Sequence, residues 1–213
     1  MGTYNKGIIG AFSGKVGPVV GASWRGKEIL RSLPKKSNRI ATPEQALHRM
    51  KFTAVISFLN PIHPIISRYY GTNQGEKSRI NRAMSYHMKE VVQYADPDHT
   101  FAYNKVQVSK GYLPGIEGGS VASSITNTLT FNWNDNSGQG EAQATDALVV
   151  AVYEPSSKQW VYSLSVANRN TTTGNLILPP TFSGTTLEVW VLFASVDEKK
   201  YATSTYLGNV LVS

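Results

Sequence analysis

The chain has 213 residues, of which 41% are hydrophobic and 16% charged, with no cysteine and a formal net charge of +7. This composition excludes a disordered tail, a disulfide-stapled miniprotein, a thiol enzyme and a cysteine-ligated zinc site. The length fits one large domain or two small ones with a buried core. Composition therefore indicates a globular protein and names no reaction.

Charge is distributed unevenly along the chain. Residues 1–110 contain 17 Lys and Arg against 6 Asp and Glu, and the remainder contains 4 against 8, so the two parts carry +11 and −4. A basic segment of this size attracts polyanions such as nucleic acid or an acidic protein. The same charges are equally expected on solvated helix faces.

The chain shows no targeting or membrane-spanning pattern. No stretch reaches the roughly 18 consecutive apolar residues that cross a bilayer. The start lacks the basic region and continuous apolar run of a signal peptide. We therefore expect the protein to be made and to fold in the cytoplasm, unless a dedicated machine exports it.

Residues 1–41 are predicted to form a glycine-rich basic arm. Glycine recurs every three to five positions between residues 7 and 26, which disfavours a helix and favours an extended segment. Two strand-like runs, Val19–Trp24 and Glu28–Ser32, flank Arg25-Gly26-Lys27 and predict a β-hairpin. A polar linker follows.

Residues 42–99 are predicted to form a helical hairpin. Thr42-Pro43-Glu44-Gln45 supplies an N-cap, a proline at the first helical position and a capping-box Gln, so a helix is expected from here to about Leu59. A short helical piece is expected at Ile65–Tyr70 and a second helix at Glu76–Tyr94.

Two sets of side chains are assigned to the faces of these helices. The residues at helical spacing, expected to form one wide apolar stripe, are Leu47, Met50, Ala54 and Phe58, together with Val55 and Leu59. The cations expected on the outer surface are Arg68, Lys77, Arg79, Arg82 and Lys89.

From about Phe101 the period changes from helical to alternating, which predicts an antiparallel β-sandwich of Ig or fibronectin type over residues 100–213. Seven strands are expected, around Val106 and at Thr128–Trp133, Ala147–Tyr153, Trp160–Val166, Asn175–Leu178, Leu187–Ala194 and Tyr201–Val212. Trp133 is expected in the core, and Gly118-Gly119-Ser120 in a loop at a strand end. The predicted fold class is α+β.

No group of residues supports catalysis or binding of a metal or cofactor. Ser13-Gly14-Lys15-Val16 lacks the Ser or Thr of a phosphate-binding loop, no Ser lies in a G-x-S-x-G elbow, and the four histidines lack metal-ligand spacing. The acids available for glycoside hydrolysis fall mostly at predicted turns: Glu117, Asp135, Glu141, Asp146, Glu154 and Glu188. We therefore expect a protein that is not an enzyme.

A basic cluster is the best candidate for a binding site. Its members are Trp24, Arg25, Lys27, Arg31, Lys35, Lys36 and Arg39. Glu28 is the only acid between Trp24 and Arg39, and Trp24 adds an aromatic ring that can stack a base. The sequence contains no helix-turn-helix, zinc finger or RNA-recognition signature, so an acidic protein subunit is the preferred partner and nucleic acid the alternative.

Several motifs stand out along the chain, namely Gly14–Gly21, Trp24–Gly26, Leu30–Pro34, Thr42–Gln45 with Arg49 and Phe52, Gly111–Gly115, Phe131–Trp133 and Ser204–Gly208. They resemble the motifs of an uncharacterised family of bacterial and phage proteins. One departure is that Asn38-Arg39-Ile40-Ala41-Thr42 lacks the proline of the family's Asn-Pro-Asn-Thr stretch. The resemblance implies no activity and favours a virion or assembly role.

Together these observations predict a structural subunit of a phage or phage-like particle, located in the virion or the cytoplasm. Its basic arm would dock onto other protein subunits or further copies of itself, and its sandwich would be displayed. A nucleic-acid-binding accessory protein is the alternative. A third option is a carbohydrate-binding sandwich with Trp160, Tyr162 or Trp190 as a stacking platform, although such aromatics are more often core residues.

Overall fold

A computed structural model of the chain describes residues 2–3, 12–24, 26–35, 40–72, 77–95 and 98–213. The chain divides into two compact units, Met1–Pro43 and Glu44–Ser213. We call the first the N-terminal unit and the second the body, and each is described by itself.

The N-terminal unit is a small antiparallel sheet with the strand order β1-β4-β3-β2. Its strands are β1 (Gly2–Thr3), β2 (Gly14–Val16), β3 (Val19–Trp24) and β4 (Lys27–Ser32). The predicted hairpin is confirmed as β3 and β4. Gly17 has a φ of 57°, which only glycine adopts readily, and it allows the tight turn between β2 and β3.

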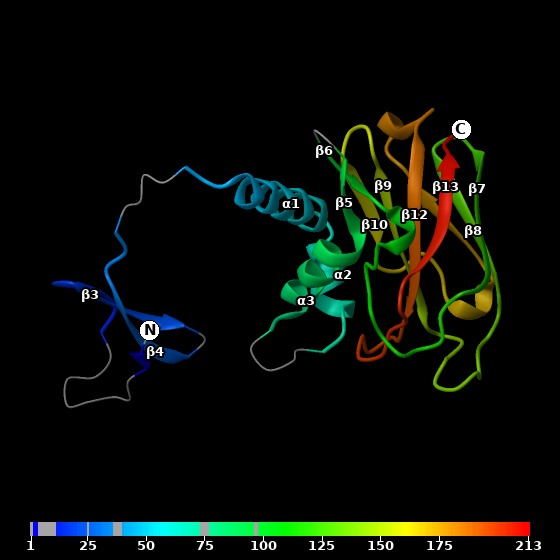
Figure 1. Ribbon diagram of the computed structural model, residues 1–213. Helices are drawn as coiled ribbons and strands as arrows, with labels where there is room; N and C mark the ends of the chain where they lie inside the picture. The colour runs from blue at the N-terminus through cyan, green and yellow to red at the C-terminus, as the bar shows by residue number, and fades with distance from the viewer. Residues whose placement is uncertain (1, 4–11, 25, 36–39, 73–76, 96–97) are drawn as a thin grey trace. The chain divides into compact units, whose positions relative to one another are not determined.

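The helices of the body are α1 (Pro43–Leu59), α2 (His63–Tyr69) and α3 (Arg79–Tyr86). The predicted helix beginning at Pro43 and ending at Leu59 is confirmed. The expected position of its apolar stripe is wrong at one end, because Leu47 and Met50 remain 37% and 46% exposed. Only the last turns of α1, with Val55, Phe58 and Leu59, pack into the core, while its first turns extend away from the sandwich (Figure 1).

The second predicted helix, Glu76–Tyr94, is shorter than expected. It begins after Ser78, whose hydroxyl accepts the N–H of Asn81, and it passes into a π-helical turn at His87–Val91. The chain then forms β5 (Val92–Ala95), which pairs with β6 (Asp98–Phe101). The β-branched pair Val91-Val92 favours this change from helix to strand.

The sandwich consists of two antiparallel sheets with the orders β10-β9-β12-β13 and β11-β8-β7. Its strands are β7 (Glu117–Ile125), β8 (Thr128–Asn134), β9 (Ala147–Glu154), β10 (Gln159–Ser163), β11 (Thr173–Ile177), β12 (Thr186–Ala194) and β13 (Thr205–Leu211). The predicted Ig- or fibronectin-like sandwich is confirmed, with seven strands divided four and three.

One predicted strand is wrong. Val106 and Val108 are buried in an irregular segment instead of a strand. The first strand of the sandwich is β7, which contains Gly118-Gly119-Ser120, expected in a loop. The pairing of β7 with β8 shifts register between Glu117 and Ser120, and Gly118 has a φ of 61° there, so the glycines mark a bulge within the strand.

The four-stranded sheet is the middle layer of the body, with the helices on one face and the three-stranded sheet on the other (Figure 1). Along β9, Val149 and Ala151 face the helices, whereas Val150 and Val152 face the other sheet. Burial of both faces explains why β9 and β12 are continuous apolar runs. The helical segment 42–99 and the sandwich 100–213, separate in the sequence-based division, thus share one core.

Candidate partner-binding surface

The N-terminal sheet places its cations on one face. Lys15 lies opposite Val20, and Val20 lies opposite Arg31. Trp24 lies opposite Lys27, four residues along both strands from the Val20 and Arg31 pair. Directly opposite residues, and residues an even number apart, share a face of a sheet. Lys15, Trp24, Lys27 and Arg31 therefore form one surface, which we call the basic face.

The opposite face carries small and apolar residues. It contains the glycines of β2 and β3, together with Val16, Val19 and Leu30, and Glu28 is the only charged residue of β2 to β4 there. Phe12 lies directly over Gly21, where a Cβ atom would approach the Phe12 carbonyl oxygen to 2.3 Å. Only glycine permits this contact, so Phe12 packs on this face, whereas the three described cations of β2 to β4 lie on the basic face together with the buried Ile29.

The whole net charge of the protein belongs to the N-terminal unit. Residues 1–43 contain eight Lys and Arg against the single acid Glu28, a net +7, whereas the body contains thirteen cations and thirteen acids. Within the body, residues 44–110 carry a net +4 and residues 111–213 a net −4, so its charges cancel only in sum.

The N-terminal unit has almost no core of its own. Among its described residues only Gly21 and Ile29 are buried, while Trp24 is 48% and Val16 61% exposed. Domains of about 40 residues bury too small a fraction of their surface to be stable without disulfides, metals or a partner. This unit therefore requires further contacts to reach ordinary stability.

The residues of the predicted basic cluster fall in three places. Trp24, Lys27 and Arg31 lie on the basic face, which also includes Lys15, a residue outside the predicted cluster. Lys35 is exposed beyond the end of β4. Arg25, Lys36 and Arg39 lie outside the described residues. The alternation of Lys27, Ile29 and Arg31 along β4 was the available sequence signal for a shared face.

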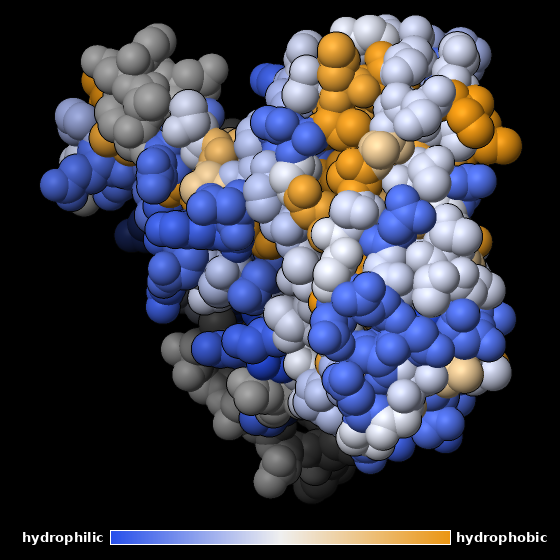
Figure 2. Space-filling model, turned by 90° about the vertical axis from the view of Figure 1, so that its right-hand side faces the viewer, coloured by the Kyte–Doolittle hydropathy of each residue, from blue (hydrophilic) through white to orange (hydrophobic). Residues whose placement is uncertain are grey.

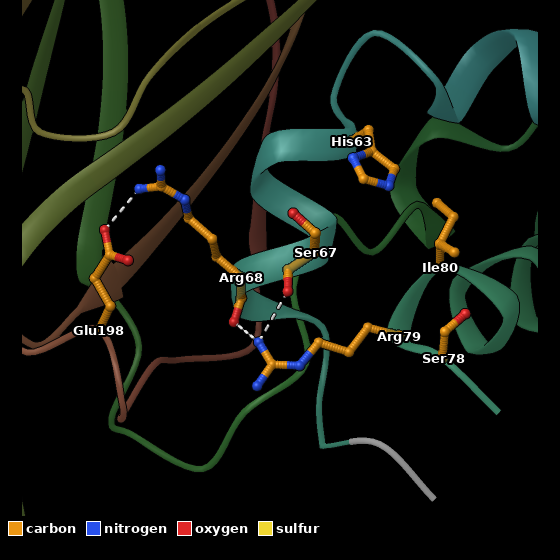
Figure 3. Close-up of a pocket in the computed structure, with 7 residues that line it drawn as sticks. All are labelled: His63, Ser67, Arg68, Ser78, Arg79, Ile80 and Glu198. Atoms are coloured by element: carbon orange, nitrogen blue, oxygen red, sulfur yellow. Dashed lines mark hydrogen bonds and ion pairs between the residues drawn. The ribbon is translucent and has the colours of Figure 1, made fainter. Parts of the chain in front are cut away.

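The cations expected on the outer surface of the helices have other roles in part. Arg68 forms an ion pair with Glu198 at 2.7 Å, and this carboxylate raises the pKa of the guanidinium. Arg79 donates to the carbonyl oxygens of Ser67, at 3.1 Å, and Arg68 (Figure 3). These carbonyls belong to the C-terminal end of α2, where helices leave acceptors unsatisfied.

Arg82 donates to the carbonyl oxygen of Thr72, in the segment that follows α2. Arg79 therefore stabilises the end of α2 and Arg82 the segment after it, and neither guanidinium belongs to a free basic surface. The hollow of about 500 Å³ beside them is lined by His63, Ser67, Arg68, Ser78, Arg79, Ile80 and Glu198 (Figure 3). Its two guanidinium groups are already occupied, so it offers no ready anion site.

The four histidines differ in their exposure to solvent. His48 and His63 are exposed, His99 is partly buried, and His87 is fully buried at the start of the π-helical turn. The Nδ1 atom of His87 lies 2.8 Å from the carbonyl oxygen of Ala83, and burial lowers its pKa to about 4. Within the described part of the chain, no three His, Asp or Glu side chains are grouped to hold a metal ion.

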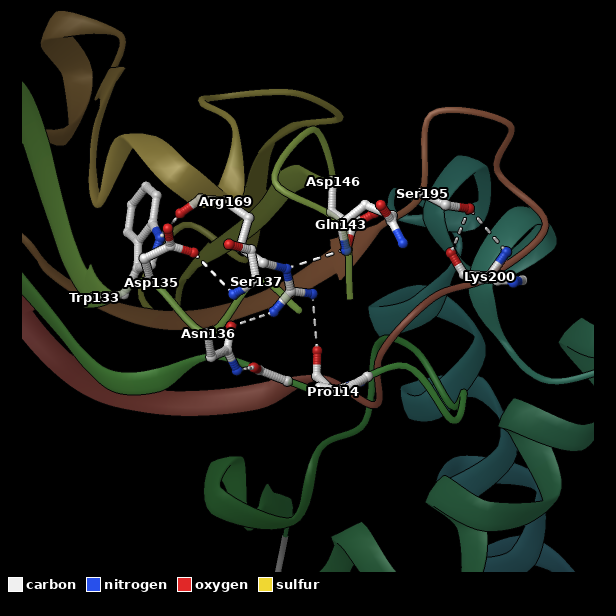
Figure 4. A network of polar contacts seen from close by, with 11 residues as sticks. Pro114, Trp133, Asp135, Asn136, Ser137, Gln143, Asp146, Arg169, Ser195 and Lys200 are labelled. Atoms are coloured by element: carbon white, nitrogen blue, oxygen red, sulfur yellow. Dashed lines mark hydrogen bonds and ion pairs between the residues drawn. The ribbon is translucent and has the colours of Figure 1, made fainter. Parts of the chain in front are cut away.

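A buried polar network holds the loops at one end of the sandwich (Figure 4). The Arg169 guanidinium contacts Asp146 at 3.1 Å, Asn136 at 2.5 Å and the Pro114 carbonyl oxygen at 3.0 Å. It also lies 3.9 Å from the centre of the Phe193 ring. Burial lowers the pKa of Arg169, and the Asp146 carboxylate opposes this shift. The network therefore joins three loop segments to the core.

Three of the six sandwich acids expected at solvated turns are in fact buried. Asp146 pairs with Arg169, Glu154 accepts the amide N–H groups of Ser156 and Ser157, and Glu188 accepts the hydroxyl of Tyr206. Each buried carboxylate thus has a local structural partner. The expectation failed because the sequence does not show which strand ends are covered.

The proposed carbohydrate platform is mostly core. Trp190 is fully buried and packs on Trp160 at 5.3 Å between ring centres. Trp160 packs in turn on Phe58 at 4.9 Å, and only Tyr162 reaches 36% exposure. A flat, exposed stacking surface made from these three rings is therefore absent from the described structure.

The outer face of the three-stranded sheet is polar except at one end. Its cross-strand rows contain Thr130, Asn132 and Asn175, whereas Ile125 and Ile177 both lie opposite Thr128 and are 59% and 79% exposed. Figure 2 views the sandwich from this side and shows hydrophobic residues gathered near one end of a mainly polar surface.

Among the described residues, no helix has the length and apolar character to cross a bilayer.

These features define a fibronectin-type sandwich protein in which helices cover one sheet and the N-terminal unit carries the net charge. The chain belongs to a family of unknown function (DUF6266), which matches residues 11–208. No curated protein matches the chain.

Among solved structures, the fn3 domain of the human collagen alpha-1(XX) chain, determined in solution, is similar with 12% identity and a TM-score of 0.34. The match covers 49% of this chain and 91% of that domain. A likeness at this level adds nothing to the strand order described above.

Proposed function

We propose that this protein is a non-enzymatic structural or assembly protein that binds acidic surfaces of neighbouring protein subunits through the basic face of its N-terminal sheet. The observation that carries the proposal is the position of the net charge. A unit with a charge of +7 buries only two of its described residues, whereas the neutral body has two extensive cores.

The charge argues for an acidic partner. The N-terminal unit contains one acid and eight cations, so the negative charge that neutralises these cations has to come from outside this unit. In the body, three exposed acids, Glu141, Asp197 and Glu198, contact Lys200, Lys199 and Arg68. The complement that we propose is an acidic surface on a neighbouring subunit.

The setting we propose is a phage or phage-like particle, in the virion or in the cytoplasm of its host. This part of the proposal is supported by the sequence resemblance described above. The neighbouring subunits would be copies of this chain or other particle proteins.

The test of the proposal reverses the charge of the basic face. A variant with Lys15→Glu, Lys27→Glu and Arg31→Glu is compared with a control of equal charge change on the body, Lys77→Glu, Lys89→Glu and Lys199→Glu. We expect wild type and control to bind poly-L-glutamate with an affinity that falls with salt, and the basic-face variant to lose this binding. Equal binding by all three proteins would contradict the proposal.

Nucleic-acid binding is the second candidate, because Trp24 shares the basic face with Lys27 and Arg31. Aromatic side chains beside cations stack the bases of single strands. In this case a single-stranded oligonucleotide would quench the fluorescence of wild-type protein and leave that of a Trp24→Phe variant unchanged. Equal affinity for poly-L-glutamate and the oligonucleotide, with no quenching, would favour the acidic protein partner.

A further inference from the structure

The body contains a groove of about 570 Å³ that shares no lining residue with the hollow near Arg68. It is bordered by α1, by β6 and by the turn between β9 and β10. None of the interactions described above gives this groove a role.

The apolar wall of the groove is mainly aromatic. Phe58 stacks on Phe101 with ring centres 4.5 Å apart, and it meets the edge of Tyr153 at 4.9 Å. Met50, on the exposed part of α1, and Ala54 continue this wall towards solvent. The volume and the aromatic lining suit a large aromatic or aliphatic side chain.

The charged side chain at the rim is that of Lys158. It lines the groove together with His99, and none of the described residues lining the groove is acidic. Lys158 is exposed at the β9–β10 turn. The rim therefore complements a carboxylate placed next to the apolar anchor.

The edge of β6 offers backbone groups to the groove. In the described sheets, β6 has a strand neighbour on one side, β5. The N–H of Ala102 donates to the carbonyl oxygen of Val91 at 3.0 Å, and the next pair along the ladder is Phe101 opposite Val92. Hydrogen-bonded and non-hydrogen-bonded pairs alternate in antiparallel ladders, so the N–H and C=O of Phe101 point away from β5.

This edge faces the groove, because the three consecutive residues His99, Thr100 and Phe101 all line it whereas no residue of β5 does. A ligand in extended conformation can use such an edge, whereas a helix has its backbone groups already paired. An extended peptide is therefore the ligand that can pair with the edge of β6, fill the aromatic wall of the groove and place a carboxylate near Lys158.

We propose that this groove binds an extended segment of a partner protein, which adds as a strand beside β6, inserts an aromatic or large aliphatic side chain between α1 and Tyr153, and places an acidic residue near Lys158. This site does not depend on the basic face of the N-terminal sheet. The body would then have its own peptide-binding function.

The test uses the full-length protein and fluorescein-labelled peptides, with fluorescence polarisation as the readout. The probe has the sequence Glu-Val-Phe-Val-Glu with blocked ends. One comparison peptide replaces both Glu by Lys, and another carries N-methyl groups on the Phe amide and on both Val amides, so that neither edge of the peptide can donate there. We expect both comparison peptides to bind at least about tenfold more weakly, because one loses the carboxylates and the other the strand hydrogen bonds.

Variants of the protein locate the binding. Ala54→Arg fills the groove and is expected to weaken binding of the probe by at least about tenfold, and Lys158→Glu is expected to reverse the preference between the Glu and Lys peptides. Phe52→Ala is the matched control, since Phe52 is 47% exposed on α1 and does not line the groove. Thermal unfolding of each variant verifies that the body is folded.

Three results would overturn the proposal. They are no binding of the probe at millimolar concentration, equal binding by wild type and a folded Ala54→Arg variant, and equal binding of the N-methylated peptide. A concentration-dependent dimer that Ala54→Arg abolishes would show that a second copy occupies the groove instead. The basic-face variant is expected to bind the peptide probe as wild type does, even where it loses binding of poly-L-glutamate. Failure of the peptide proposal can therefore be distinguished from failure of the proposed function.

Discussion

The guanidinium of Arg169 and the carboxylate of Asp146 form an ion pair with an Nε–Oδ2 distance of 3.1 Å, and neither side chain is accessible to solvent beyond 1%. Removing one member of a buried pair leaves the other charge uncompensated, which costs about 3–5 kcal/mol. We expect Arg169→Met to lower the free energy of unfolding by this amount, measured by urea denaturation.

The matched control is Lys200→Met, which breaks the exposed pair between Lys200 and Glu141. Exposed pairs contribute little to stability because water screens them, so this variant is expected to unfold close to the wild type. Similar losses in both variants would show that Arg169 does not hold the loops of the sandwich.

The stability of the body should depend on the protonation of His87. Burial lowers the pKa of this imidazole from 6.5 to about 4, so between these pH values the unfolded chain binds a proton that the native protein does not. Stability contributed by the neutral ring is therefore complete above pH 6.5 and decreases as the pH falls towards 4. The expected decrease from this group is about 3 kcal/mol.

His87→Gln removes this titration, and the difference between its urea-unfolding curve and that of wild type isolates the contribution of His87 from that of the carboxylates. His48→Gln, at an exposed position on α1, is the control and should retain the wild-type pH dependence. If the free energy of unfolding has the same pH dependence in His87→Gln and wild type between pH 4 and 6.5, the lowered pKa of His87 is contradicted.

The packing of Phe12 on Gly21 is expected to hold the N-terminal sheet together. In Gly21→Ala the new Cβ would lie 2.3 Å from the Phe12 carbonyl oxygen, so backbone has to shift. We expect faster hydrogen exchange throughout β3 and β4, with exchange in the body unchanged. Ser23→Ala, an exposed position on the same strand, should leave the exchange rates as in wild type, and slow exchange in Gly21→Ala would contradict the packing.

Several elements could be predicted from local sequence because their signals are local. Pro43 and the residues around it define the start of α1, and the alternation at Thr128–Trp133 defines β8, with Trp133 buried as expected. The β3–β4 hairpin follows from two strand-like runs separated by a turn containing Gly26.

Other features depend on contacts that local sequence does not reveal. Arg169 is buried because Asp146, Asn136 and Pro114 surround it, and no pattern links these positions along the chain. The layer of helices on the four-stranded sheet did have a signal, since β9 lacks the polar alternation of a strand with one solvated face. Strand register, which defines the basic face, required the pairing of β2, β3 and β4.

The central claim, that the basic face binds neighbouring subunits, is tested most directly by isolating the protein from its source under native conditions. Size-exclusion chromatography with quantitative mass spectrometry would compare wild type with the Lys15→Glu, Lys27→Glu, Arg31→Glu variant. We predict that wild type elutes in a larger assembly at constant stoichiometry with protein partners, and that the variant elutes as the free chain. Wild type that elutes free, or a variant that remains in the same assembly, would contradict the claim.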